Sequence, residues 1–129
     1  MEINDITSSV ITAVIKVHRH LGPGLLESVY EEVLHYELTR MGVVCQRQVP
    51  LPVYYEDVKM EIGFRVDLLI EKRVMLELKS VESVAAVHKK ILLTYLRLAN
   101  IHIGLLINFN EELVKDGITR LINKHYVSS

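Results

Sequence analysis

Residues 67–79 read Asp-Leu-Leu-Ile-Glu-Lys-Arg-Val-Met-Leu-Glu-Leu-Lys, and this stretch decides the fold that the sequence predicts. Two apolar runs flank the polar segment 71–73, a pattern typical of a β-hairpin with a three-residue turn. With an odd turn, Ile70 pairs with Val74, and Asp67 falls opposite Glu77. Side chains alternate along a strand, so these two acids share one face with Lys79. The other face is then apolar, with Val66, Leu68, Ile70, Val74, Leu76 and Leu78.

The chemistry of this hairpin depends on the length of its turn. A two-residue turn would shift the register by one and place Asp67 and Glu77 on opposite faces. Facing carboxylates repel each other unless something neutralises them, and a divalent cation does so. Lys79 could then orient or deprotonate an attacking water, or stabilise charge on a phosphate. A solvated face of an antiparallel hairpin remains the alternative interpretation, because such faces also alternate charged and apolar residues.

Two helices are predicted before the hairpin. The first runs from Asn4 or Asp5, either of which suits an N-cap, to His20. The second covers 26–41, after a Gly-Pro-Gly turn at 22–24. The apolar face of the first helix is formed by Ile6, Val10, Ile11, Val14, Ile15 and His18.

Further strands and two helices complete the predicted order αα, ββ, ββ, α, β, α. Strands are expected over 43–48, 50–55, 61–70, 74–80 and 101–108, the last as a continuous apolar run in a buried central position. A third helix is expected over 84–99, with its apolar side formed by Ile91, Leu92, Tyr95, Leu96 and Leu98. A short helix is expected over 116–125.

The composition favours one domain, 1–129, of an ordinary size. No apolar run approaches the ~20 residues of a membrane helix, and the acidic N-terminus lacks a signal peptide's basic region, so a cytoplasmic protein with no membrane partner is expected. The only cysteine, Cys45, excludes an internal disulfide. Its pattern favours a small hydrophobe in a strand over a nucleophile. The net charge of -1 requires any phosphate partner to bind a local patch. His88, Lys89 and Lys90 are the candidates for nucleic-acid contact.

A second motif comes from the start of the second helix. Gly24-x-x-Glu27-x-x-Tyr30, followed by Asp67 and then Glu77-Leu78-Lys79, resembles the GxxExxY family of the PD-(D/E)XK nuclease-like superfamily. The resemblance covers nearly the whole chain. It also includes Gln46-x-Gln48-x-Pro50, Tyr95-Leu96 and the segment 104–109.

The resemblance implies an α/β fold with a restriction-endonuclease-like core, in which a mixed four-stranded sheet is flanked by helices. It implies Asp67, Glu77 and the backbone carbonyl of Leu78 as ligands of Mg²⁺ or Mn²⁺. Lys79 would be the catalytic lysine, and Glu27 a further ligand or positioning acid. Two positions depart from the pattern. Val66 stands where the superfamily has proline, and Ile91 stands where related sequences usually have glutamine.

Three functions follow as hypotheses. The first is a metal-dependent nuclease that hydrolyses phosphodiester bonds of DNA or RNA. The second is a non-catalytic module that binds nucleic acid or protein on the same fold. The third is a homo-oligomeric structural protein, for which a homodimer is the simplest form.

Overall fold

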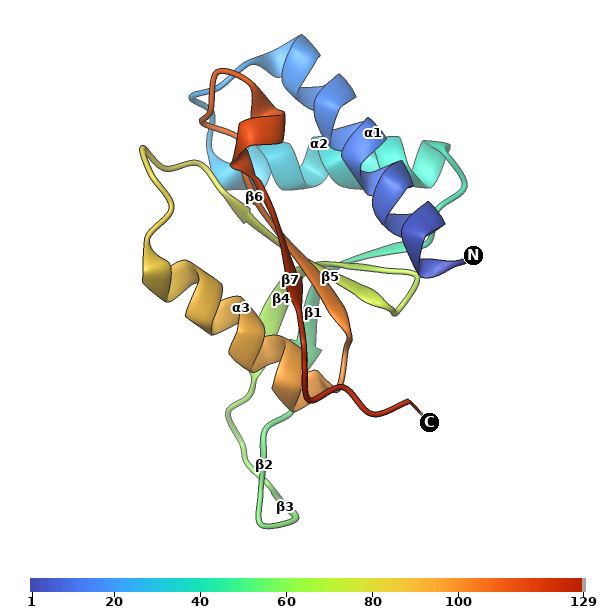
Figure 1. The fold of residues 1–129 in the computed structure, drawn as a ribbon, viewed down its shortest axis with the longest axis vertical. Coiled ribbons are helices and arrows are strands. Elements are labelled where there is room, and N and C mark those ends of the chain that lie inside the picture. The colour runs from blue at the N-terminus through green and yellow to red at the C-terminus, as the bar shows by residue number, and fades with distance from the viewer. Residues whose placement is uncertain (129) are drawn as a thin grey trace.

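The computed structural model describes residues 1–128 and contains three α-helices, seven strands and one 3₁₀ turn within that range (Figure 1). In chain order they are α1 (Ile3–Leu21), α2 (Glu27–Arg40), β1 (Cys45–Leu51), β2 (Tyr54–Tyr55), β3 (Val58–Lys59), β4 (Phe64–Ile70), β5 (Val74–Lys79), α3 (Ala86–Ala99), β6 (Ile103–Asn108), η1 (Val114–Gly117) and β7 (Ile118–Ile122). No helix among these residues is long and apolar enough to cross a membrane.

The main sheet has five strands in the order β1-β4-β5-β6-β7. Only β5 and β6 are parallel, so the sheet is mixed. Helices α1 and α2 cover one face, and α3 covers the other (Figure 1). The predicted α/β class and mixed, helix-flanked sheet are confirmed, with five strands in place of four. β2 and β3 form a separate hairpin that projects away from α1 and α2.

The β4–β5 hairpin has the predicted three-residue turn. Ile70 pairs with Val74, Leu69 with Met75, and Leu68 with Leu76. The turn residues Glu71 and Lys72 adopt positive φ angles of 51° and 56°. This register places Asp67 and Glu77 on facing strands, as the odd turn requires.

The prediction of a helix over 116–125 is wrong. A 3₁₀ turn ends at Gly117, and Ile118–Ile122 pairs antiparallel with β6, which gives the sheet its fifth strand. β-branched residues at 118, 119 and 122 suit a strand, and the open edge of β6 supplies its hydrogen-bonding partner.

Two smaller predictions near the strands and helices are also corrected. The segment 50–55 is not one extended piece, because β1 continues to Leu51 and Tyr54–Tyr55 pairs instead with β3. Asn4 and Asp5 lie inside α1, because Glu2 takes the N-cap position without a side-chain hydrogen bond.

The sheet is buried on both faces, so the hairpin does not have one apolar and one solvated side. Leu68 and Leu76 pack with α1 and α2, whereas Leu69 and Met75 pack under α3. Val66 was expected beside Leu68, but it lies in the α3 core. Strand alternation is interrupted between them, at Asp67, where the pairing of β4 with β5 ends.

Helix α3 buries a narrower stripe than predicted. Leu92 and Leu96 are fully buried, whereas Ile91 and Leu98 are 40% and 41% exposed. Gly104 in β6 lies directly beneath the helix, and a Cβ there would be 3.1 Å from Leu96 Cδ1. The missing side chain therefore permits the close approach of α3 to the sheet.

Candidate metal and nucleic-acid site

Asp67 and Glu77 occupy the point where β4 and β5 separate. Beyond the Leu68–Leu76 pair, hydrogen bonds to side-chain carboxylates replace the backbone–backbone hydrogen bonds between the two strands. The Leu78 N–H donates to Asp67 Oδ2 at 2.8 Å, and the Asp67 N–H donates to Glu77 Oε1 at 3.4 Å. The two carboxylates are thus brought together and held by the backbone of the facing strand.

The surroundings of this pair disfavour two negative charges. Burial, followed by the neighbouring charge of Asp67, raises the pKa of Glu77 to about 8. Burial also raises the pKa of Asp67, and the Leu78 N–H only partly opposes this effect. A cation between the carboxylates would remove the conflict, since Mg²⁺ binds through one or two carboxylates and keeps places for water and phosphate.

Lys79 and Leu78 complete the β5 side of the site. Lys79 lies two residues beyond Glu77 and is half-buried. Its charge partly offsets the rise in the pKa of both carboxyl groups. The N–H and C=O of one residue point to the same side of an extended strand. The Leu78 carbonyl therefore faces β4, as its N–H does, toward Asp67. The donor set of two carboxylates and one carbonyl suits a hard divalent ion.

Glu27 lies at the border of this set. It is the exposed first residue of α2, and its Oε2 accepts a hydrogen bond from the Ser80 N–H at 3.2 Å. Glu27 and Asp67 line one hollow of about 390 Å³, together with Ser28, Glu31 and Gln48. Within residues 1–128, no three acidic, histidine or cysteine side chains converge as a preformed metal-ligand group.

The glycine and tyrosine of the Gly24–Tyr30 motif have structural roles. Gly24 has a φ of 95°, a conformation that disfavours side chains. The Tyr30 hydroxyl donates to the Gly22 carbonyl at 2.6 Å and accepts from the Leu25 N–H at 3.1 Å. Its ring stacks on Phe109 with centroids 4.3 Å apart. The turn and the start of α2 are thereby anchored to the core, which positions Glu27.

Sequence reasoning missed a buried acid beside the site. Glu31, 7% exposed, binds Arg47 through Nε at 3.2 Å and Nη2 at 3.1 Å. Its second oxygen accepts from the Gln48 amide. The charge of Glu31 also contributes to the raised pKa of Asp67, after burial. The four-residue spacing from Glu27 places both acids on one side of α2 and was a usable signal. No pattern indicated Arg47.

Tyr95 of α3 is a second neighbour of the acids, and the sequence places it on the apolar side of its helix and within the family resemblance. Its ring stacks on Phe64 with centroids 4.3 Å apart. Burial first, and then the charges of Glu77 and Asp67, raise the pKa of the Tyr95 hydroxyl. The acids therefore face α3 as well as α2.

The basic segment of α3, residues 88–90, does not form part of the site around Asp67 and Glu77. His88 Nδ1 accepts a hydrogen bond from the Ala85 N–H at 3.1 Å and so caps its own helix. Lys89 and Lys90 are exposed and do not line the hollow that contains Asp67. Their contact with nucleic acid stays a prediction.

Comparison with protein families agrees with this fold. The model of the PD-(D/E)XK nuclease superfamily matches residues 4–121, so the chain belongs to that superfamily. No curated protein and no solved structure matches the chain significantly.

Proposed function

We propose that the chain is a divalent-metal-dependent nuclease of the GxxExxY group, which hydrolyses phosphodiester bonds of DNA or RNA as a single domain. The observation that carries the proposal is the end of the β4–β5 ladder. There Asp67 and Glu77 meet beside Lys79, and Asp67 takes the Leu78 N–H that a regular ladder would give to backbone. Membership of the superfamily supports the same reading.

Each side chain has a chemical role in this proposal. Asp67, Glu77 and the Leu78 carbonyl would hold Mg²⁺ or Mn²⁺. Such an ion would supply Lewis-acid chemistry and would lower the pKa of a water molecule. Lys79 in its charged form would stabilise negative charge on the phosphate, or in its neutral form would accept a proton from the attacking water. Glu27 positions the β5 end through the Ser80 N–H and contributes charge to the hollow.

A non-catalytic binding module is the second candidate. Two observations favour it. Ile91, which replaces the usual glutamine, is 40% exposed on α3 and supplies no polar group. Glu31 is neutralised by Arg47, so one of the acids next to Asp67 is already paired. A module of this kind would keep binding nucleic acid or protein after the loss of Asp67.

A cleavage assay separates the two candidates. Labelled DNA and RNA are incubated with Mn²⁺ or with a chelator, using wild type, Asp67→Asn and Lys79→Met. Asparagine retains the acceptor for the Leu78 N–H, so the fold is expected to survive. Loss of the carboxylate is expected to reduce cleavage roughly a hundredfold or more.

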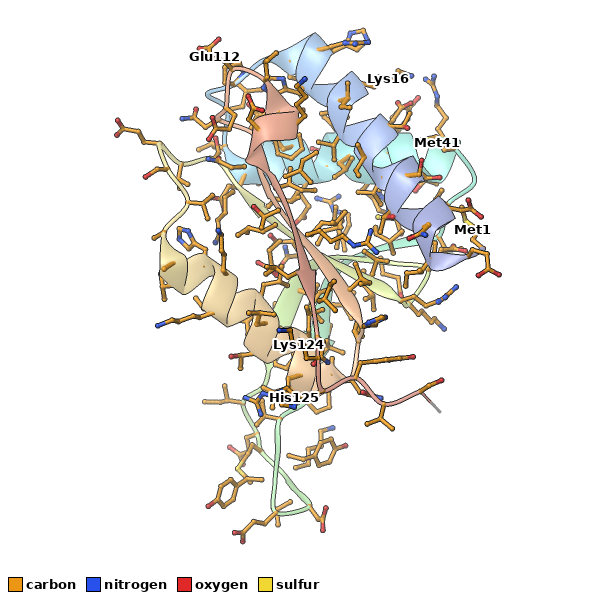
Figure 2. All side chains as sticks on the ribbon, in the orientation of Figure 1. Met1, Lys16, Met41, Glu112, Lys124 and His125 are labelled. Atoms are coloured by element: carbon orange, nitrogen blue, oxygen red, sulfur yellow. The ribbon has the colours of Figure 1, made fainter. Side chains whose placement is uncertain are left out.

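The matched control is Glu112→Gln. Glu112 is exposed on the loop between β6 and η1 (Figure 2), and it does not line the hollow that contains Asp67. It loses the same single charge without touching the site and is expected to cleave as wild type does. Cleavage by Asp67→Asn at the wild-type rate, or no metal-dependent cleavage by a folded wild type, would favour the binding module.

A further inference from the structure

Two arginines lie on either side of the hollow that Glu27, Glu31 and Asp67 line (the acidic hollow). Arg65 lies on β4, two residues before Asp67, and its Nη1 donates to the Gln48 carbonyl at 3.3 Å. The Gln48 amide and Arg47 both bind Glu31. A continuous chain of hydrogen bonds therefore runs from Arg65 through Gln48 and Glu31 to Arg47, linking β4, β1 and α2. Gln48 and Glu31, in the middle of this chain, line the hollow with Asp67.

Each arginine also lines a neighbouring hollow. Arg65 borders one of about 440 Å³, together with Lys59, although Glu61 adds one opposing charge there. Arg47 borders another of about 400 Å³, together with Arg40, and Glu32 adds one opposing charge there. An arginine thus borders the acidic hollow on each side, and Arg47 is at the same time paired with Glu31. This pattern suits a polyanion whose central phosphate meets a metal ion and whose adjacent phosphates meet cations.

The arginines have donors to spare for such a ligand. A guanidinium carries five N–H donors in a planar fork that matches phosphate oxygens. Arg65 is exposed and uses one donor, on an uncharged carbonyl. Among the described residues it forms no ion pair, since the pairs there are Lys16–Glu37 and Arg47–Glu31. Arg47 retains Nη1 after binding Glu31.

The strand between these hollows is open to a ligand. β1 is an edge strand of the sheet, and Arg47 and Gln48 are both exposed on it. Gln48 has a positive φ of 49°, a strained conformation for a residue with a side chain. Its pairing with Asp67 is missing from an otherwise regular register, between Arg47–Leu68 and Val49–Val66. The irregularity directs the Gln48 amide to Glu31 and its carbonyl to Arg65.

We propose that a nucleic-acid backbone runs along β1, with Arg65 and Arg47 binding the phosphates on either side of the phosphodiester at Asp67. The position of that phosphodiester rests on the proposed function, whereas the arginine contacts are measurable without cleavage. The contact surface is then the β1–β4 side of the molecule, and not the α3 segment 88–90.

Binding is measured by fluorescence anisotropy on labelled DNA and RNA of one sequence, in Ca²⁺, with gels to show that the probes stay intact. Arg65→Gln is expected to weaken binding about tenfold and to lower the salt dependence by about one phosphate contact. Arg47→Lys keeps a positive charge beside buried Glu31 but removes the fork, and is expected to weaken binding while the protein stays folded. Arg97→Gln, an exposed arginine on α3, is the matched control and is expected to bind as wild type does.

The double variant Lys89→Gln/Lys90→Gln tests the competing surface. The proposal is overturned if that variant loses binding while Arg65→Gln retains it, if Arg97→Gln weakens binding as much as Arg65→Gln, or if folded wild type binds neither probe. Wild-type affinity in Arg47→Lys removes Arg47 from the surface. Loss of binding in Arg65→Gln, combined with no cleavage by wild type, would keep the surface and reject the nuclease. Cleavage by wild type, combined with normal binding by Arg65→Gln, would reject the surface and keep the nuclease.

Discussion

Replacing Glu77 by glutamine should stabilise the metal-free protein at high pH. Glutamine keeps the oxygen that accepts the Asp67 N–H, and its amide can donate to the Asp67 carboxylate. The change also removes a charge that burial and Asp67 both disfavour, which is why the pKa of Glu77 is raised to about 8. Between its ordinary pKa of 4.5 and about 8, the folded protein therefore binds a proton that the unfolded chain releases.

The sign and size of the effect follow from this difference. Because the folded state holds more protons over that range, the free energy of unfolding of wild type falls as pH rises. At 1.36 kcal/mol per pH unit, the interval from 4.5 to about 8 gives an upper limit of about 5 kcal/mol. Glu77→Gln lacks the titrating carboxyl group, so its free energy of unfolding does not fall in this way. Its advantage over wild type should be near zero at pH 4, where Glu77 is protonated, and largest at pH 9.

The assay is urea unfolding of both proteins in a chelator at pH 4 and pH 9, with Glu112→Gln as the control for loss of one charge. Adding Mn²⁺ near pH 8 should then stabilise wild type, by about 2.7 kcal/mol at a hundred times the dissociation constant, and leave Glu77→Gln unchanged. An advantage that is equal at both pH values would refute the electrostatic reasoning. Stabilisation of both proteins by Mn²⁺ would show that Glu77 is not a ligand.

Two substitutions and one chemical modification test the fold further. Gly104→Ala places a Cβ 3.1 Å from Leu96 Cδ1 and should cost about 1–3 kcal/mol in urea unfolding; an unchanged midpoint would mean that α3 is not held so closely. Asn108→Ala removes hydrogen bonds of 3.1 and 2.9 Å to the Val81 N–H and carbonyl, and should lower the free energy of unfolding by about 2 kcal/mol. It should also speed hydrogen exchange of the backbone amides that follow β5, and full protection of those amides would contradict this prediction. Burial raises the pKa of the Cys45 thiol to about 12, so iodoacetamide should modify it far more slowly in the folded protein than in urea, and equal rates would contradict its burial.

Much of this molecule could be predicted because the deciding signals are local. The polar segment 71–73 and the alternation on either side of it predict the hairpin register, which the structure confirms at Ile70 and Val74. The same register explains why Asp67 and Glu77 meet. Helical periodicity and the Gly-Pro-Gly break likewise predict α1 and α2, within a few residues at each end.

Other features depend on partners distant in the chain. The segment 118–122 became a strand because β6 offered an open edge, and no local pattern reports the presence of that edge. The pairing of Glu31 with Arg47 spans 16 residues and required α2 to lie against β1.

The sequence by itself therefore determined the hairpin, the first two helices and the acidic pair with its lysine, since neighbours along the chain decide turn length and periodicity. Tertiary structure alone decided the fifth strand, the core that Val66 joins, and the arginines beside the acidic hollow. These features arise where separate segments compete for one sheet edge or for one buried charge, and the free energy that selects among them exists only once the segments are packed.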